Sequence, residues 1–458
     1  MTKNLSRFDT SSREMVAPIS FAEACSLVAA QSTAILSTNA LKSRRCDLLR
    51  ALGRVLAAPT LADRDQPPFP RVTRDGFAVR AQDLVSGTSL RVVSQLRAGE
   101  PWPSGNPPLA PGEAIEIMTG AALPPGADAV LMVEHAQETL AGSMDDSSVE
   151  APLVRHVTPH TGRTLIAGEN VVPCGSEARC GEVLLPQGTR LGPEQIALAA
   201  SCGLLSVPVF PQPRVAILAT GDELVEPSLP WPGFELPANQ EKTPIQSHQI
   251  YDSNSFALST LVRHAGALPL RQRPALDQPD DLAACIHQGL DAAPLLLLTG
   301  GVSMGKFDLV EDVLATMGAE FFFTGVKMQP GKPVIFGRIP ATATRAARYF
   351  FGLPGNPVSA MVTFRVFVQP ILAALSGEQC WQPNVALAKL AADLAMKPGL
   401  TRFLPAHLDT SQPVATVTTV RTQGSGDLAA NARANCYLIV PEDRDVLVAD
   451  QIVQVLLR

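Results

Sequence analysis

Aromatic residues make up only 5% of this 458-residue chain, which has 3 tryptophans and 3 tyrosines. It also has no run of lysine or arginine, and its formal net charge is −6. Proteins that bind nucleic acid present basic patches to the phosphates and often stack rings on the bases. These two absences argue against a nucleic-acid partner.

The sequence also lacks an uninterrupted apolar run of the roughly 20 residues that a membrane helix needs. Residues 1–16 contain no apolar core of a signal peptide. The 8 cysteines are scattered without a C-x-x-C pair, and the histidines form no H-E-x-x-H motif. No set of serine, histidine and aspartate lies in a nucleophile-elbow motif. We therefore expect a cytoplasmic protein with no membrane association, no zinc site and no covalent acyl chemistry.

A chain of this length is too long for one hydrophobic core, so we expect several domains. Apolar runs that alternate with helical patterns between residues 214 and 375 predict a three-layer α/β domain with a largely parallel sheet. Short strand-like pieces between prolines and glycines predict β-rich parts elsewhere. The predicted division is a flexible tail (1–18), a discontinuous connecting domain (19–58 and 153–195), an inserted β-rich module (59–152), the α/β domain (196–375) and a C-terminal β-barrel-like domain (376–458).

Helical spacing of apolar residues predicts one helix over Phe21–Ser32 and a second, amphipathic helix over Asp47–Leu56. A third, over Pro357–Leu375, begins with a proline, which suits the first turn of a helix.

Two glycine-rich turns follow apolar runs in the α/β part. Leu295–Leu298 leads into Gly300-Gly301, and Tyr349–Phe351 leads into a turn that contains Gly355. A strand that ends at a helix N-terminus presents unpaired N–H groups to an anion, and glycine allows a phosphate to approach closely. Two such turns predict a phosphorylated ligand at the carboxyl edge of the sheet. The residues that we expect to contact it are Thr299, Gly300, Gly301, Ser303, Gly305, Pro354, Gly355, Asn356, Pro357 and Ser359.

A third turn, Thr220-Gly221-Asp222-Glu223, follows the predicted strand Arg214–Ala219. Its acids suit a metal ion or ligand hydroxyls, but on their own they favour a solvated turn with capping residues; the presence of three such turns at strand ends favours a site. Another loop, Pro330-Gly331-Lys332, precedes a strand and offers a lysine for an anion. Lys327 is a second cationic candidate, with a solvated surface lysine as the alternative.

These motifs and several others occur together in one order along the chain. They are Asp75–Arg80, Ile117–Ala121, Thr220–Leu224, Tyr251–Asn254, Gly300–Gly305, Pro330–Pro333 and Gly352–Ala360. In this order they resemble the MoeA family of molybdopterin molybdenumtransferases, which is related to the E domain of gephyrin. The resemblance extends from about Ile19 to the C-terminus.

The resemblance implies that the α/β domain binds molybdopterin. It implies insertion of molybdate into adenylated molybdopterin, with Mg²⁺ and with release of AMP. It also implies a homodimer with a shared active site, and it allows contacts with other proteins of molybdenum cofactor biosynthesis. Two alternatives remain: a molybdopterin adenylyltransferase, which would consume ATP, and a non-catalytic scaffold of the gephyrin type.

The resemblance also assigns roles to residues. Asp252 and Asp308 would hold the metal, although both are also good helix caps. Asp75 and Thr119 would reach the site of the partner subunit. The catalytic set that follows is Asp75, Thr119, Glu223, Asp252, Asp308 and Lys332.

The chain departs from the family pattern where basic residues are usual. Leu400 and Pro405 stand in place of two arginines, Gln329 replaces a common lysine, and Lys306 and Asn170 replace acids. Arg402 and Ser425 are the remaining candidates for oxyanion binding in the C-terminal domain, but strand alternation leaves the direction of Arg402 open.

Overall fold

The computed structural model describes residues 17–38, 41–84, 88–141, 154–227, 245–301 and 309–458. The chain forms two compact units. Unit 1 comprises Met1–Ala57, Gly188–Pro193 and Ser206–Arg458, and unit 2 comprises Ala58–Gln187 and Glu194–Leu205.

A six-stranded sheet forms the centre of unit 1. Its strands, in spatial order, are β16 (Leu268–Arg271), β13 (Arg214–Ala219), β17 (Leu295–Thr299), β21 (Arg348–Leu353), β20 (Ile335–Ile339) and β18 (Glu320–Phe323). The first four are parallel, and β20 and β18 are antiparallel. Leucines 295–298 are all fully buried, as expected for a strand covered on both faces. The predicted largely parallel sheet is confirmed.

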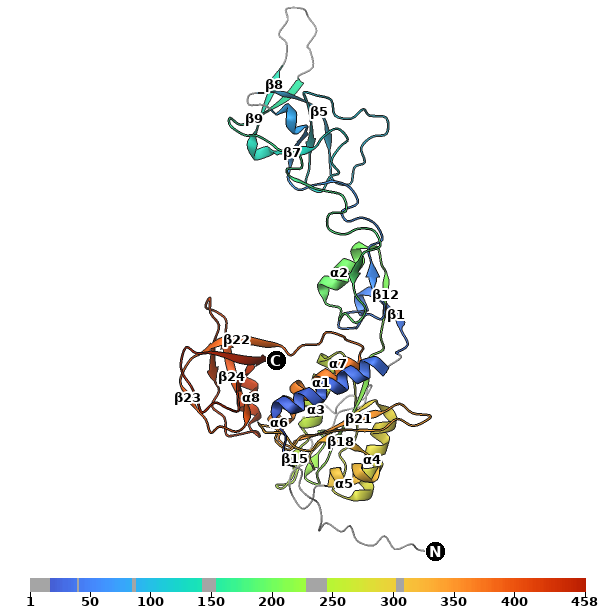
Figure 1. Cartoon of the computed structure of the whole chain (residues 1–458), viewed down its shortest axis with the longest axis vertical. Helices are drawn as coiled ribbons and strands as arrows, with labels where there is room; N and C mark the ends of the chain where they lie inside the picture. Colours follow the sequence, from blue (N-terminus) through green and yellow to red (C-terminus); the bar gives the residue numbers. More distant parts are fainter. Residues whose placement is uncertain (1–16, 39–40, 85–87, 142–153, 228–244, 302–308) are drawn as a thin grey trace, which may run out of the picture. The chain divides into compact units, whose positions relative to one another are not determined.

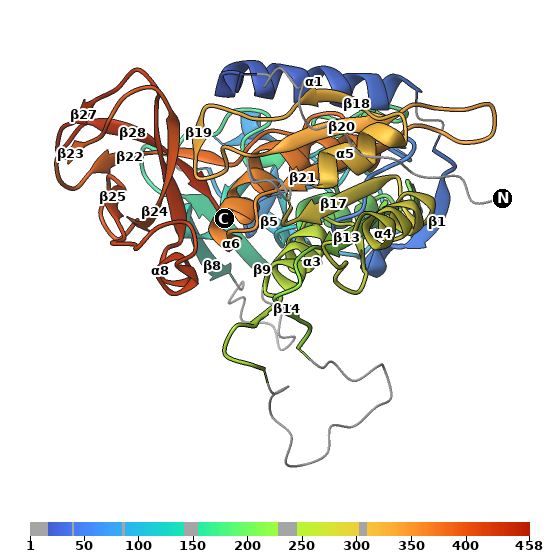
Figure 2. The ribbon, with the colours of Figure 1, turned by 90° about the horizontal axis from the view of Figure 1, so that it is seen from below.

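Helices cover both faces of this sheet. They are α1 (Phe21–Thr38), α3 (Asn254–His264), α4 (Pro279–Ala292), α5 (Leu309–Thr316), α6 (Pro357–Thr363), the π-helical segment η4 (Phe364–Val368) and α7 (Gln369–Leu375). One core joins the sheet to α1, α3 and the α6–η4–α7 helix, and the other joins it to α4 and α5. Figure 1 shows α1 running along α7, and Figure 2 shows β13, β17 and β21 side by side. The predicted three layers are therefore present.

The helix over Pro357–Leu375 is continuous but changes to π-helical geometry at η4. By length and composition it could cross a membrane, with a mean hydropathy of 1.7. However, 72% of it is buried inside the protein, so it serves as the central helix of the core.

The C-terminal part of unit 1 is a closed β-barrel, which confirms the barrel-like domain. Strands β24, β25, β22, β28 and β26 pair in turn, and a β24–β26 pairing closes the ring. β19, from the α/β region, adds to β24 in parallel. The bounds are β19 (Met328–Gln329), β22 (Val385–Leu390), β23 (Leu394–Ala395), β24 (Thr401–Asp409), β25 (Thr416–Thr419), α8 (Leu428–Arg433), β26 (Cys436–Val440), β27 (Val446–Leu447) and β28 (Ile452–Leu457).

The predicted helix over Asp47–Leu56 is wrong. The chain instead forms β1 (Arg44–Asp47), paired with β12 (Ser206–Val209), and then the short 3₁₀ turn η1 (Leu48–Arg50). The side chain of Asp47 accepts a hydrogen bond from the backbone N–H of Leu49 and so stabilises a turn. Leu49 and Leu52 are exposed, whereas Leu48, Ala51 and Val55 are buried, so the apolar residues do contact the core but from a turn and not from a helix.

Unit 2 contains a second six-stranded sheet in the order β7-β4-β6-β5-β9-β8. Its bounds are β4 (Gly76–Val79), β5 (Leu90–Leu96), β6 (Glu113–Ile117), β7 (Ala129–Met132), β8 (Ala136–Ala141) and β9 (Val154–Pro159). The shorter elements of the chain are β2 (Thr60–Leu61), β3 (Arg71–Val72), η2 (Ala81–Asp83), η3 (Val133–His135), β10 (Val171–Val172), β11 (Val183–Leu185), α2 (Pro193–Ser201), β14 (Leu224–Val225) and β15 (Ile250–Tyr251).

Candidate functional site

Three parallel strands of unit 1 end side by side. In the register of the sheet Ala219 of β13 lies beside Thr299 of β17, and Thr299 lies beside Leu353 of β21. The backbone N–H of Thr220 donates to the carbonyl oxygen of Thr299 over 2.9 Å. The three predicted turns therefore leave the sheet at one edge.

Asn254, the first residue of α3, ties two of these turns together. Its Nδ2 donates to Thr299 Oγ1 (2.8 Å) and to the carbonyl oxygen of Gly355 (2.7 Å). Thr299 Oγ1 in turn lies 3.4 Å from the carbonyl oxygen of Pro354. One amide side chain thus sets the spacing between the two glycine turns.

The glycine pair after β17 is required by its surroundings. Gly300 and Gly301 have φ angles of 91° and 61°, in the left-handed region that favours glycine. A Cβ on Gly300 would lie 2.4 Å from the carbonyl oxygen of Thr220, and one on Gly301 would lie 3.0 Å from Thr220 Oγ1. The glycine turn after β17 therefore packs directly against the Thr220 turn after β13.

Buried polar atoms without partners gather at the same edge. Thr220 Oγ1, Asn254 Oδ1 and Ser255 Oγ are buried and make no hydrogen bond with any described residue. Leaving a buried polar group unpaired costs about 1–3 kcal/mol. The edge is therefore suited to a ligand that supplies hydrogen bonds.

Two acids of the predicted set have clear structural partners. Asp252 is 2% exposed, and its Oδ1 accepts from the backbone N–H of Ser255 (3.0 Å), as in the capping interpretation. Asp222 accepts from the backbone N–H of Asp277 (3.1 Å). Partial burial, the charge of Asp222 and then that of Glu223 raise the pKa of Asp277, a residue that the sequence did not single out.

Arg402 is buried, at 6% exposure, and the structure resolves its direction. Its Nε donates to Gln329 Oε1 (3.0 Å), and its Nη1 donates to the carbonyl oxygen of Leu400 (3.3 Å). No carboxylate of the described residues pairs with it. Lys327 and Lys332 are exposed on the loop that carries Gln329. The Arg402 guanidinium therefore has a positive charge that no described carboxylate neutralises, and it can bind an anion.

Ser425 meets the N-terminal end of α6. Its Oγ accepts from Asn356 Nδ2 (2.8 Å), and its carbonyl oxygen accepts from the backbone N–H of Val358 (3.1 Å). Ser359, 3% exposed, bonds through its carbonyl oxygen to Thr363 Oγ1. A loop of the barrel thus lies at the second glycine turn.

The turn at Gly331 lies against the same helix. A Cβ on Gly331 would lie 2.5 Å from Thr363 Cγ2, and its φ is 112°. Glycine there lets the loop that carries Pro330 and Lys332 lie close to α6.

In unit 2 the structure brings Asp75 and Thr119 together. Asp75 Oδ1 accepts from the backbone N–H (2.7 Å) and the hydroxyl (2.8 Å) of Thr119, and these bonds lower the pKa of Asp75. A Cβ on Gly76 would lie 2.0 Å from the carbonyl oxygen of Leu131, which explains the glycine of this motif.

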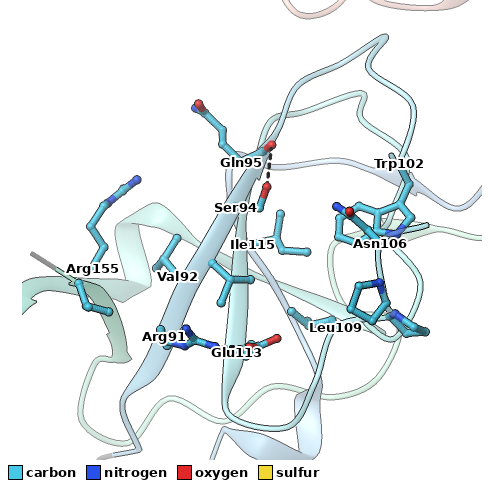
Figure 3. Close-up of a pocket in the computed structure, with 14 residues that line it drawn as sticks. Arg91, Val92, Ser94, Gln95, Trp102, Asn106, Leu109, Glu113, Ile115 and Arg155 are labelled. Carbon is cyan, nitrogen blue, oxygen red and sulfur yellow. Dashed lines mark hydrogen bonds and ion pairs between the residues drawn. The ribbon is translucent and has the colours of Figure 1, made fainter. Parts of the chain in front are cut away.

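Unit 2 also has an open groove of about 680 Å³ along β5 (Figure 3). Trp102, Asn106 and Leu109 lie on one side of Ile115 and Arg155 lies on the other. None of the predicted site residues lines it, so it is separate from the predicted chemistry.

Ser303, Gly305 and Asp308 lie outside the described residues. Within the described part of the chain, no three acid, histidine or cysteine side chains gather to hold a metal ion. The sequence analysis missed Asn254 and Asp277 as site residues. Asn254 could have been noticed because it begins a helix just after Asp252, whereas nothing in the sequence marks Asp277.

The whole chain matches known families in three consecutive parts. Residues 19–203 match the MoeA N-terminal region (domain I and II), residues 216–374 match a probable molybdopterin binding domain, and residues 387–457 match the MoeA C-terminal region (domain IV). A molybdopterin molybdenumtransferase of Haemophilus influenzae is 31% identical over 89% of this chain and 92% of its own length. The chain belongs to the MoeA family of molybdopterin molybdenumtransferases. It is accordingly a transferase of molybdenum cofactor biosynthesis.

Further relatives agree with this family. The molybdopterin molybdenumtransferase of Bacillus subtilis is 32% identical over 89% of this chain and 88% of its own. A crystal structure of the molybdopterin biosynthesis MoeA protein of Pyrococcus horikoshii OT3 superposes with a TM-score of 0.69 at 25% identity, covering 96% of this chain and all of the other.

We predict that Gly300→Ala destabilises the fold by about 2 kcal/mol or more, because the new Cβ meets a backbone oxygen and the φ angle is unfavourable. Gly355→Ala is the matched control, since its Cβ would meet only Gly300 Cα at an ordinary 3.6 Å. Urea unfolding of both variants measures the difference. Equal stability of the two would contradict the close approach of the turns.

We predict that Asp277 makes stability fall as pH rises from its ordinary pKa of 3.8 through its raised value in the fold. The reason is that in this window the unfolded chain loses the proton that the folded chain retains. Asp277→Asn should therefore reduce the loss of melting temperature between about pH 4 and pH 7. Asp222→Asn should act in the same direction by removing the charge next to Asp277, and Asp443→Asn, an exposed carboxylate of the barrel, serves as control. An unchanged pH profile in Asp277→Asn would disprove the shift.

Proposed function

We propose that this MoeA-family transferase inserts molybdate into adenylated molybdopterin and releases AMP. The observation that carries the proposal is the pair of glycine turns at the ends of β17 and β21, held at fixed spacing by Asn254. Backbone N–H groups at such turns bind phosphate oxygens, and the adenylated substrate carries phosphates. The unpaired atoms Thr220 Oγ1 and Asn254 Oδ1 are available to hydrogen-bond to it.

The molybdate oxyanion would bind to positively charged side chains near the barrel. Arg402 is buried among neutral partners, and its planar guanidinium matches a tetrahedral oxyanion. Lys332 and Lys327 extend from the loop that also carries Gln329, and Ser425 adds a hydroxyl at the second turn. We propose that Arg402 binds molybdate in place of the arginines that Leu400 and Pro405 replace.

Mg²⁺ is the metal that these residues fit best. Carboxylate oxygens are its preferred protein ligands, and it usually takes only one or two of them beside substrate phosphates and water. That preference agrees with the lack of a three-ligand cluster in the described part of the chain. Asp252, which has one carboxylate oxygen free of the Ser255 bond, and Asp308 would hold the ion. When bound, it would neutralise charge on the phosphates.

We also propose that the enzyme is a cytoplasmic homodimer in which Asp75 and Thr119 of one subunit complete the site of the other. Their mutual hydrogen bonds fix the Asp75 carboxylate and keep it ionised, as a ligand-facing acid requires. We also propose the five-part domain division, with the inserted β-rich module at residues 59–152.

The decisive assay measures molybdate-dependent AMP release from adenylated molybdopterin by the full chain. We predict that Arg402→Met raises the half-saturating molybdate concentration about tenfold or more, because a charged hydrogen bond contributes about 1.5–3 kcal/mol. Lys332→Ala should raise it too, Arg402→Lys should restore part of the affinity, and Lys389→Met on β22 is the control.

An unchanged molybdate dependence in Arg402→Met would remove this residue from the oxyanion site. ATP consumption without molybdate would instead identify an adenylyltransferase, and the absence of both reactions would identify a scaffold.

The shared site predicts complementation. Asp75→Asn chains and Asp252→Ala chains should each be inactive, whereas mixed dimers should recover part of the activity because one of their two sites has both acids intact. Mixed dimers confirmed by differential tagging that stay inactive would refute a site shared between subunits.

A further inference from the structure

Two arginine side chains lie where the central helix of unit 1 meets the barrel. Arg365 belongs to η4, and Arg458 follows β28. The guanidinium carbon of Arg458 lies 4.5 Å from the centre of the Tyr437 ring, and its Nη1 donates to the carbonyl oxygens of Asn431 (2.6 Å) and Ala434 (2.9 Å).

The same cluster contacts the helix. Asn431 Nδ2 lies 3.9 Å from Met361 Sδ, and Met361 precedes Arg365 by four residues, about one helical turn. Burial lowers the pKa of Arg365, and Tyr437 and Arg458 are the groups that act on its charge, with Arg458 lowering the pKa further. Because residues four apart lie on the same face of a helix, Arg365 lies on the face that meets Asn431, and Arg458 bonds to the same asparagine.

No carboxylate side chain of the described residues pairs with either guanidinium of this cluster. Arg365 makes no hydrogen bond or ion pair with any described residue, and the Nε atoms of Arg365 and Arg458 are both buried and unpaired. The Asn431 side-chain oxygen is already shared by the Tyr437 hydroxyl and Arg458. Both side chains are partly buried, and their two Nε–H groups are donors without an acceptor among the described residues.

We propose that Arg365 and Arg458 form a binding site for a small tetrahedral oxyanion, of the phosphate, sulfate or molybdate class. Guanidinium groups bind such anions with paired, charge-assisted hydrogen bonds. Asn431 Nδ2, whose only acceptor is a sulfur, can add a further donor. Arg365 stands eight residues from Pro357, roughly 12 Å along the helix, so this site is distinct from the glycine turns.

The anion would join the two parts of unit 1. Arg365 is on the helix of the α/β domain and Arg458 is on the barrel, so one bound oxyanion stabilises their contact. The contact between the helix and the barrel also includes the hydrogen bond from Asn356 Nδ2 to Ser425 Oγ. Occupancy of the cluster therefore supports the geometry of the strand-end site without taking part in its chemistry.

The test is thermal unfolding of the full chain, without pterin, in phosphate, sulfate or molybdate against chloride of equal ionic strength. Each effective oxyanion at tens of millimolar should raise the melting temperature by roughly 2 °C or more in the wild type. The rise should be clearly smaller in Arg365→Met and Arg458→Met, in which only the strand-end site remains to bind the anion. It should keep its wild-type size in Arg444→Met, which removes an exposed arginine from the same barrel, and the part due to this cluster should remain in Arg402→Met, which alters the other oxyanion site.

Because each variant is compared with itself in chloride, a change in its basal stability does not affect the result. An equal rise in the Arg365→Met/Arg458→Met double variant would overturn the proposal. If the variants lose part of the rise with all three anions, the cluster is a general phosphate-type site, and if they lose it with molybdate alone, the cluster is a second molybdate site. Since AMP release is not measured, failure here leaves the proposed transferase activity untouched.

A direct check is a crystal grown with selenate. An anomalous selenium peak between the two guanidinium groups would support the site. Selenate bound elsewhere but absent from this cluster would contradict it.

Discussion

The parallel register of β13, β17 and β21 is the constraint on which the site depends. Because these strands end level with one another, three chain reversals occupy one edge, and two of them are in van der Waals contact. Only glycine fits where Gly300 approaches the carbonyl oxygen of Thr220. The tight packing also leaves Thr220 Oγ1 buried without a partner among the described residues, so the geometry that requires glycine also creates polar groups available to a ligand.

The second constraint is the docking of the barrel on the α/β domain. β19 leaves the α/β domain to pair with β24, and this pairing brings Gln329 to Arg402. At the other side, Asn356 holds Ser425 at the start of α6. The barrel therefore brings the Arg402 guanidinium to Gln329 and the Ser425 hydroxyl to Asn356.

Local signals made the strand-end turns predictable from the sequence, because a glycine pair after an apolar run depends on few neighbours. The direction of Arg402 could not be predicted, since it depends on a strand some seventy residues earlier in the chain pairing with β24. Asn254 and Asp277 were missed for the same reason: their partners are distant in sequence. The helix expected over Asp47–Leu56 is absent because Asp47 stabilises a turn and the residues on both sides of it pair with distant segments, Asp47 with Ser206 and Leu56 with Val209.

The helix that begins at Pro357 contacts the barrel at several points along its length. Its first turn meets Ser425, its second places Met361 against Asn431, and the π-helical segment that follows carries Arg365 beside Tyr437 and Arg458. A π-helical segment adds a residue to a turn and so changes the direction of the side chains after it. An arginine in such a segment, in a helix otherwise buried in the core, carries a desolvation cost that apolar packing alone does not offset. The charge is best explained by a ligand, and the contact between helix and barrel is the place where a ligand would act on both domains at once.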